Sequence, residues 1–215
     1  MKNIIAIWKP KGPTSHDMVY KVRKITGEKK VGHAGTLDPL AEGILVMGIT
    51  RDGTKQLSEL VKKEKEYLAT VKLGEVSTTD DDEGEKSTTS DRRPSREEVE
   101  EILPKFTGKI MQVPPVFSAI KVSGKRAYDE ARKGKEIELE PREILIKEIE
   151  LIKYEYPLVE LRIVTGPGAY IRSIARDLGQ ELQAGGYLAN LIRTRVGDFS
   201  KNEAFTLEEL EKHYG

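Results

Sequence analysis

Residues 32–48 read GHAGTLDPLAEGILVMG and present one carboxylate, Asp38, in a stretch bounded by glycine and proline. A residue that precedes proline is disfavoured in the helical conformation, so Asp38 is expected in an extended or turn backbone. Gly35 and Gly43 let the flanking chain bend where other residues would be strained. Such a loop holds a reactive group still, although for an aspartate taken alone a turn-forming or capping role is commoner.

The apolar run that follows the loop predicts a strand at 44–49, and four further runs predict strands elsewhere. Residues 158–164 alternate between apolar and polar side chains, which is the pattern of a half-buried antiparallel strand. The other predicted strands lie at 4–8, 67–73 and 144–151.

Helices are predicted from capping signals and from apolar spacing. Ser15 is a candidate N-cap for a helix that Gly27 ends. A second helix runs from about 170 to 182 and carries Arg172 on an early turn, near a strand-to-helix junction. Capping boxes, in which Ser or Thr is followed three residues later by Glu, mark two more helix starts: Ser95 with Glu98, and Thr206 with Glu209. The pattern is one of mixed α and β structure.

Two regions have no apolar pattern for a core of their own. Residues 77–90 form an acidic loop whose carboxylates miss the spacing of a calcium-binding loop, so metal binding there is disfavoured. Residues 113–136 are rich in cations and are expected to form an arm that clamps a phosphate backbone.

The composition limits the class of protein. With 215 residues, 37% of them hydrophobic, the chain is large enough for a packed core, and no apolar segment is long enough to span a bilayer. Since cysteine is absent, a disulfide framework, a thiolate nucleophile and a sulfur-ligated metal are excluded. His16, His33 and His213 are too few and too scattered for a zinc site. We expect a cytoplasmic protein without metal or membrane.

The net charge is zero, but the charges are segregated along the chain. Lysine and arginine dominate residues 1–33, whereas acids dominate residues 80–101. One face could therefore attract anions, and an ordinary solvated surface is the alternative. Motifs for phosphate loops, dinucleotide binding, serine hydrolysis and zinc proteolysis are absent, which disfavours nucleotide hydrolysis and redox chemistry.

The stretch at 32–48 closely resembles the catalytic motif of the bacterial TruB-type tRNA pseudouridine-55 synthases, whose pattern is Gly-His-x-Gly-x-Leu-Asp-Pro-x-Ala-x-Gly. Further family motifs follow in order along nearly the whole chain: 9–15 (KPKGPTS), 54–55 (TK), 65–67 (KEY), 79–84 (TDDDEG), the arm at 114–128, and 169–172 (AYIR). The resemblance implies an α+β pseudouridine synthase fold, with a mixed, mainly antiparallel central sheet flanked by helices and loops.

The resemblance also implies the catalytic residues. The family's catalytic aspartate falls on Asp38, and its charge-balancing arginine falls on Arg172. Tyr67 matches the tyrosine that stacks on the target base with its hydroxyl near the sugar or base, and Tyr170 matches the tyrosine on the other side of the pocket. A guanidinium does not lose its proton, so Arg172 is expected to keep Asp38 charged and to fix its direction.

Further positions match the family's RNA contacts. His33 matches the histidine that helps to hold the extruded nucleotide out of the RNA. Leu191 matches an apolar pocket residue ahead of a paired-arginine stretch, although here Thr194 separates the two arginines. The remaining candidates for RNA or structural contacts are Lys9, Lys55, Lys121, Lys125 and Arg126.

The implied reaction is the isomerisation of uridine 55 in the T loop of tRNA, without a cofactor, by a monomer that extrudes the base. No obligate protein partner is expected. Whether Asp38 attacks the sugar, attacks the base or removes a sugar proton stays open. Two alternatives also stay open: the same chemistry on another structured RNA, including guide-directed targeting, and a non-catalytic RNA-binding or RNA-folding protein on the same fold.

Two departures from the family pattern bear on these expectations. Residues 167–172 read PGAYIR where the family usually has KGTYIR, so a hydroxyl and a cation are missing. Most relatives continue beyond the equivalent of residue 215 into a small RNA-binding PUA domain. We therefore expect residues 1–215 to form a single catalytic domain without it, and tRNA binding to be weaker than in longer relatives.

Overall fold

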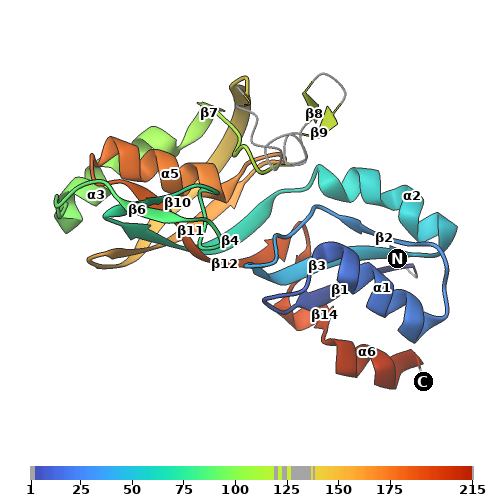
Figure 1. The fold of residues 1–215 in the computed structure, drawn as a ribbon. Coiled ribbons are helices and arrows are strands. Elements are labelled where there is room, and N and C mark those ends of the chain that lie inside the picture. Colours follow the sequence, from blue (N-terminus) through green and yellow to red (C-terminus); the bar gives the residue numbers. More distant parts are fainter. Residues whose placement is uncertain (1–2, 119–120, 123–124, 127–136, 138, 215) are drawn as a thin grey trace. The chain divides into compact units, whose positions relative to one another are not determined.

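The computed structural model describes residues 3–118, 121–122, 125–126, 137 and 139–214 (Figure 1). The chain divides into two compact units. The first consists of Met1–Leu68, Val164–Pro167 and Leu191–Gly215, and the second of Ala69–Ile163 and Gly168–Asn190. Three strands begin in one unit and end in the other: β4 (Lys65–Leu73), β11 (Leu158–Thr165) and β12 (Gly186–Val196).

The described part of the first unit is a mixed sheet with three α-helices. Its hydrogen-bonded strand order is β14-β1-β3-β12, with β2 paired to β3 and β13 paired to β12. The other elements are β1 (Ile4–Lys9), α1 (Ser15–Thr26), β2 (Val31–Ala34), β3 (Glu42–Ile49), α2 (Thr50–Val61), β13 (Phe199–Ser200), a 3-10 turn (Lys201–Glu203), β14 (Ala204–Phe205) and α6 (Leu207–Tyr214). β3 is antiparallel to β1 and β2 but parallel to β12.

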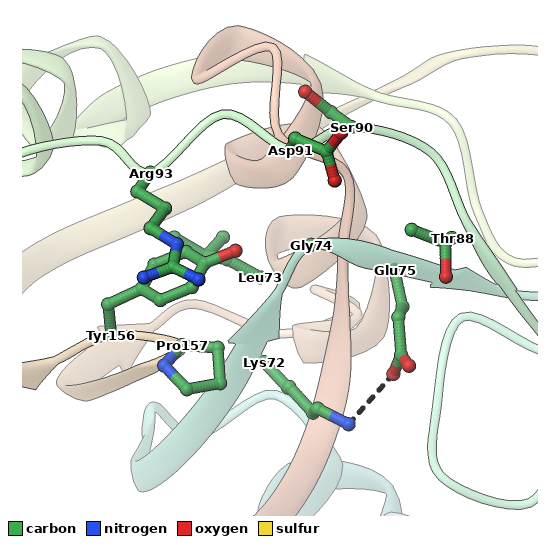
Figure 2. A pocket seen from close by; sticks show the side chains of 10 residues that line it. All are labelled: Lys72, Leu73, Gly74, Glu75, Thr88, Ser90, Asp91, Arg93, Tyr156 and Pro157. Carbon is green, nitrogen blue, oxygen red and sulfur yellow. Dashed lines mark hydrogen bonds and ion pairs between the residues drawn. The ribbon is translucent and has the colours of Figure 1, made fainter.

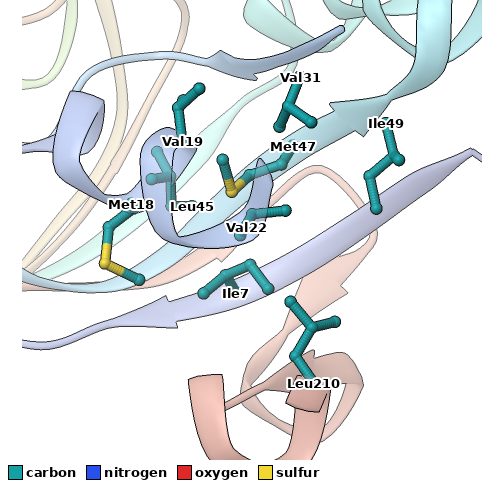
Figure 3. Packing of buried hydrophobic residues seen from close by; sticks show 9 residues of the cluster. All are labelled: Ile7, Met18, Val19, Val22, Val31, Leu45, Met47, Ile49 and Leu210. Carbon is teal, nitrogen blue, oxygen red and sulfur yellow. The ribbon is translucent and has the colours of Figure 1, made fainter. Parts of the chain in front are cut away.

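Strand β3 is buried on both faces, which explains why its sequence is a continuous apolar run rather than an alternating one. On one face, Leu45, Met47 and Ile49 pack with the apolar side of α1 and with Leu210 of α6 (Figure 3). On the other face, Ile44 and Val46 pack with residues of α2. Burial of one such side chain contributes about 1.5–3 kcal/mol, so these two clusters fix the strand that follows the Asp38 loop.

Helix α1 begins one residue earlier than the sequence predicted. The N-cap is Thr14, and its capping box is closed by Asp17, whose carboxylate accepts from the Thr14 backbone amide at 2.8 Å. The N-cap prediction for Ser15 was therefore wrong, because an aspartate at the third helical position completes the box for Thr14 instead. Gly27 ends the helix in the left-handed conformation, with φ 71°, as predicted.

The second unit has the strand order β12-β4-β11-β10-β7. Its other elements are β5 (Glu75–Ser77), β6 (Lys86–Thr88), α3 (Arg96–Ile102), a 3-10 turn (Leu103–Phe106), β7 (Gly108–Gln112), β8 (Lys121–Val122), β9 (Lys125–Arg126), β10 (Arg142–Glu155) and α5 (Ile171–Glu181). The predicted capping box of Ser95 and Glu98 is present. The prediction of a loop over 77–90 is wrong in part, because β5 and β6 pair as a short antiparallel hairpin near its ends.

The predicted arm at 113–136 is covered only in part by the described residues. β8 and β9 form an antiparallel pair within it. Residues 127–136, and the side chains of Lys121, Lys125 and Arg126, lie outside what the structure describes. Among the helices that it does describe, none has the length and apolar character of a membrane span.

Candidate functional site

The loop that carries Asp38 is held by a backbone anchor on each side of this residue. The buried Ser15 hydroxyl donates to the Leu37 carbonyl at 2.9 Å and accepts from the Leu37 amide at 2.8 Å. After Asp38, the Pro39 carbonyl accepts from the Gly12 amide at 2.8 Å. Asp38 itself is half-buried, so its carboxylate sits on a fixed backbone at the edge of the core.

Lys9, at the end of β1, is the first of two buried cations near this carboxylate. Its side chain is completely buried, and Nζ donates to the Pro10 carbonyl at 2.9 Å. Burial lowers the pKa of Lys9 to about 8, while the negative charge of Asp38 acts in the opposite direction. The sequence analysis predicted that Lys9 contacts either the RNA or the protein itself. The burial of Lys9 favours the structural role.

Arg193 of β12 is the second buried cation, with 1% of its surface exposed. Its Nη2 donates to the Gly35 carbonyl at 3.0 Å and its Nη1 to the Thr36 carbonyl at 3.3 Å. Its Nε donates to the Ile44 carbonyl at 2.8 Å. Burial lowers the pKa of Arg193, and the neighbouring Tyr67 hydroxyl and the Asp38 carboxylate counter this effect.

Tyr67 lies on β4 in the same unit and is buried. Burial raises the pKa of the Tyr67 hydroxyl, whereas the nearby Arg193 guanidinium lowers it. Asp38 adds a further upward effect on the pKa of this hydroxyl. The first unit therefore brings Asp38, Tyr67, Lys9 and Arg193 into one electrostatic neighbourhood.

His33 and Leu191, predicted contacts of the RNA and of the base, also belong to this unit. His33 is half-buried on β2, and burial lowers its pKa below the ordinary 6.5, which favours a neutral imidazole at neutral pH. Leu191 is buried and precedes Arg193 by two positions on β12, so both side chains point to the same face of the strand. Lys55, by contrast, is exposed on α2 with its ammonium 3.7 Å from the Asp52 carboxylate.

Arg172 lies in the second unit, in the first turn of α5, and is buried. Its Nη1 contacts the Asp81 carboxylate at 3.2 Å and the Thr79 carbonyl at 3.3 Å. Its Nη2 donates to the Phe117 carbonyl at 3.0 Å. The guanidinium thus ties α5 to the acidic segment after β5 and to the segment that leads into the arm.

Tyr170, the N-cap residue of α5, is held by the side-chain amide of Gln112. The Gln112 Oε1 accepts from the Tyr170 amide at 2.9 Å, and its Nε2 donates to the Tyr170 carbonyl at 3.0 Å. The guanidinium carbon of Arg142 lies 4.9 Å from the centre of the Tyr170 ring. The position of this ring is therefore fixed by backbone and side-chain contacts within the second unit.

Three residues that were not predicted as site residues take part in these arrangements: Arg193, Asp81 and Gln112. Each is nearly inaccessible to solvent, with 1%, 2% and 1% of its surface exposed, respectively. Polar residues are seldom buried without partners, so burial at this level marks them as structural parts of the site. Asp81 is one of several adjacent acids, and nothing in the local sequence distinguishes it from the half-buried Asp80 or the exposed Asp82.

The second unit also has a cavity of about 430 Å³ that contains none of the predicted site residues (Figure 2). The Arg93 guanidinium lies 5.3 Å from the centre of the Tyr156 ring at one wall, and Lys72 pairs with Glu75 at 2.8 Å at another. Cations and anions are mixed in its lining, so the cavity has no single-sign field to select a charged ligand. Among the described residues, no cluster of His, Asp or Glu has the arrangement of a metal site.

The sequence matches two protein-family profiles. Residues 23–171 match the TruB family pseudouridylate synthase (N terminal domain), and residues 172–215 match the tRNA pseudouridylate synthase B C-terminal domain.

Several similar proteins are named tRNA pseudouridine synthase B. That of Corynebacterium diphtheriae is 42% identical over 218 residues, which covers 98% of this chain and 72% of the relative. That of Brucella ovis is 44% identical over 204 residues, covering 94% and 63%. That of Parabacteroides distasonis is 44% identical over 210 residues, covering 94% and 89%. The chain thus spans between 63% and 89% of the length of these relatives.

Two solved structures have a similar fold. A chain of a Cbf5-Nop10-Gar1 complex matches with a TM-score of 0.78 and 29% identity, over 99% of this chain and 54% of that chain. A chain of an H/ACA RNP bound to a substrate RNA containing 2′-deoxyuridine matches with a TM-score of 0.74 and 27% identity, over 99% and 53%. The α+β fold with a mixed, mainly antiparallel sheet is therefore confirmed. The motifs around Asp38, the profile matches and the relatives agree: the chain belongs to the TruB family of pseudouridylate synthases.

Proposed function

We propose that the protein is an isomerase that converts uridine to pseudouridine in tRNA, at position 55 of the T loop. The observation that carries the proposal is the Asp38 loop, in which the residues on both sides of the carboxylate are pinned by Ser15 and Gly12. The buried cations Lys9 and Arg193 lie within electrostatic reach of this carboxylate. Nearby cations favour the ionised form of an aspartate, which is the form that acts as a nucleophile or base.

The reaction rearranges one nucleotide without a second reactant. The bond between N1 of uracil and the ribose breaks, the uracil turns, and its C5 becomes bonded to the same ribose carbon. C5 loses one proton and N1 gains one, so the step balances without a redox partner or a cofactor. Asp38 acts on the sugar or on the base, and either route needs an ionised carboxylate held in one direction.

Tyr67 supplies a ring for stacking on the uracil and a hydroxyl near the proton transfer. Because its pKa is raised by burial, the hydroxyl stays protonated at neutral pH and acts as a hydrogen-bond donor. Tyr170 and Arg172 keep the roles that the family resemblance implies. The support from the second unit is that both are held by defined hydrogen bonds, Tyr170 through Gln112 and Arg172 through Asp81.

RNA binding has to offset the loss of stacking when the uridine leaves the loop. Neutralisation of phosphates by lysine and arginine is the main sequence-independent source of such binding energy. We assign this role to the exposed Lys55 and to Lys121, Lys125 and Arg126 of the arm, and assign His33 to holding the flipped nucleotide out. A single catalytic domain over 1–215, a monomeric state and a cytoplasmic location also stay predictions.

The direct test incubates the purified chain with an unmodified tRNA transcript and maps pseudouridine by chemical treatment and reverse-transcription stops. Wild type is expected to modify uridine 55 only, and Asp38→Asn to abolish the product while binding the transcript. Asp52→Asn is the matched control, because Asp52 is an exposed acid of the same unit.

Two other results of this experiment would each support a different function for the protein. If wild type binds the transcript but leaves every uridine unchanged, the chain is an RNA-binding protein rather than an enzyme. If it modifies other uridines and spares the T loop, the chemistry stands and the proposed position is wrong.

A further inference from the structure

Arg193 is a buried charge, and the proposed function uses its charge but not its hydrogen bonds. Moving a charged group out of water costs several kcal/mol unless hydrogen bonds and opposite charges compensate, so a buried arginine needs a defined set of partners. Its partners here are three backbone carbonyls, those of Gly35, Thr36 and Ile44.

These carbonyls bracket the loop that carries Asp38. Gly35 and Thr36 lie just before this residue, and Ile44 lies after it, at the start of the buried run of β3. A single guanidinium therefore joins the entry of the loop to its exit. An arginine can do this because its donors are spread over a rigid plane, whereas a lysine ammonium is a single point.

The backbone of Arg193 supports the same loop from a second direction. Arg193 pairs with Gly43 in the parallel register of β12 and β3. Gly43 has φ 117°, and a Cβ at this position would lie 2.2 Å from the Arg193 carbonyl oxygen. This approach is possible only for glycine, so the two strands are in close backbone contact where the loop ends.

Tyr67 lies within electrostatic reach of the same guanidinium, and both residues are buried. One side chain thus hydrogen-bonds to the loop that carries the proposed catalytic aspartate and acts electrostatically on the Tyr67 hydroxyl.

We propose that Arg193 is a positioning residue: its guanidinium closes residues 35–44 into a fixed loop and sets the Asp38 carboxylate relative to the Tyr67 hydroxyl. This inference rests on the proposed function. In this role Arg193 acts through Asp38 and Tyr67 and does not itself touch the RNA.

The test compares Arg193→Lys, Arg193→Gln and the control Arg195→Gln. Arg195 is on the same strand, but it is partly exposed and pairs with Glu64 at 2.8 Å. For each variant we would measure the single-turnover rate of pseudouridine formation from pH 5 to 9, the Kd for the transcript, and the circular dichroism spectrum. The pH profile separates a positioning role from a purely structural one.

Arg193→Lys keeps the charge and loses the planar set of donors, so we expect a rate about 100-fold lower with an unchanged pH profile and a Kd within about threefold of wild type. Arg193→Gln also loses the charge, so the rate should fall further and the acid limb of the profile should move to higher pH as Asp38 becomes easier to protonate. Arg195→Gln should behave as wild type.

The inference is overturned if Arg193→Lys reacts as fast as wild type, if it fails to fold, or if Arg193→Gln lowers the rate without moving the acid limb. These outcomes leave the proposed function intact as long as wild type forms pseudouridine. Absence of product with wild type would remove the proposed function and this inference with it.

Discussion

The Ser15 hydroxyl hydrogen-bonds to both backbone groups of Leu37, donating to the carbonyl and accepting from the amide. The two residues are 22 positions apart, and both are buried. This pair fixes the residue next to Asp38 against the start of α1, and it explains why the hydroxyl of Thr14, rather than that of Ser15, caps the helix.

Replacement of Ser15 by alanine should lower stability and activity together. Ser15→Ala leaves the amide and the carbonyl of Leu37 buried without this partner, which costs about 1–3 kcal/mol in the free energy of unfolding. Urea denaturation measures this loss, and single-turnover assays measure the accompanying fall in rate. Ser58→Ala is the control, because Ser58 is exposed on α2. Equal stability of the two variants would contradict the anchoring role.

Removal of the Tyr67 hydroxyl should affect turnover far more than binding. Tyr67→Phe keeps the ring that stacks on the base, so the Kd for the transcript should stay within a few-fold, while the rate falls about 100-fold or more through loss of the proton-transfer group. Tyr20→Phe is the control, because Tyr20 is 56% exposed on α1. Near-normal turnover of Tyr67→Phe would limit its hydroxyl to packing and to the contact with Arg193.

Neutralisation of Asp81 should destabilise the second unit. Breaking a buried ion pair by changing one partner costs about 3–5 kcal/mol, and the Arg172–Asp81 contact is buried on both sides. We therefore expect Asp81→Asn to lower the urea midpoint strongly. Asp82→Asn is the matched control: Asp82 is exposed and pairs with Lys86 on the surface, where such pairs contribute about 1 kcal/mol or less. Similar midpoints for the two variants would contradict the prediction.

Lys9 should make stability depend on pH in the alkaline range. Its pKa falls from 10.5 to about 8 on folding, so between these values the folded state holds fewer protons than the unfolded state, and stability rises with pH. The cost of burying the charge is fully present below pH 8 and is lost above 10.5. Lys9→Met removes this dependence, so the unfolding free energy of wild type minus that of the variant should rise by on the order of 3 kcal/mol across the window.

Chemical denaturation at several pH values measures this difference. Lys55→Met serves as the control, since Lys55 is exposed. A difference between wild type and Lys9→Met that stays constant with pH would mean that the Lys9 ammonium is not buried in solution.

The local sequence was sufficient for features that depend on neighbours in the chain. The capping boxes at Ser95 and Thr206 each join residues three positions apart, and both are present. The strand at 44–49 followed from its apolar run, and the family followed from the motif around Asp38. The N-cap of α1 was predicted wrongly as Ser15 instead of Thr14. The local sequence does not reveal that the Ser15 hydroxyl hydrogen-bonds to Leu37, which is distant in the chain.

The family, the catalytic aspartate and several of the helices and strands could be predicted from the amino-acid sequence, whereas α2 and β12 were not predicted. Which charges are buried became evident from the packing of the folded chain. Arg193 and Arg195 look alike in the sequence, yet Arg193 is buried against carbonyls 149 to 158 positions away, whereas Arg195 is partly exposed. Capping hydrogen bonds and apolar periodicity depend on residues that are close in the chain, so they can be recognised in a short segment. A charge loses its water and gains its compensating partners only when distant segments pack together, so its burial cannot be recognised there.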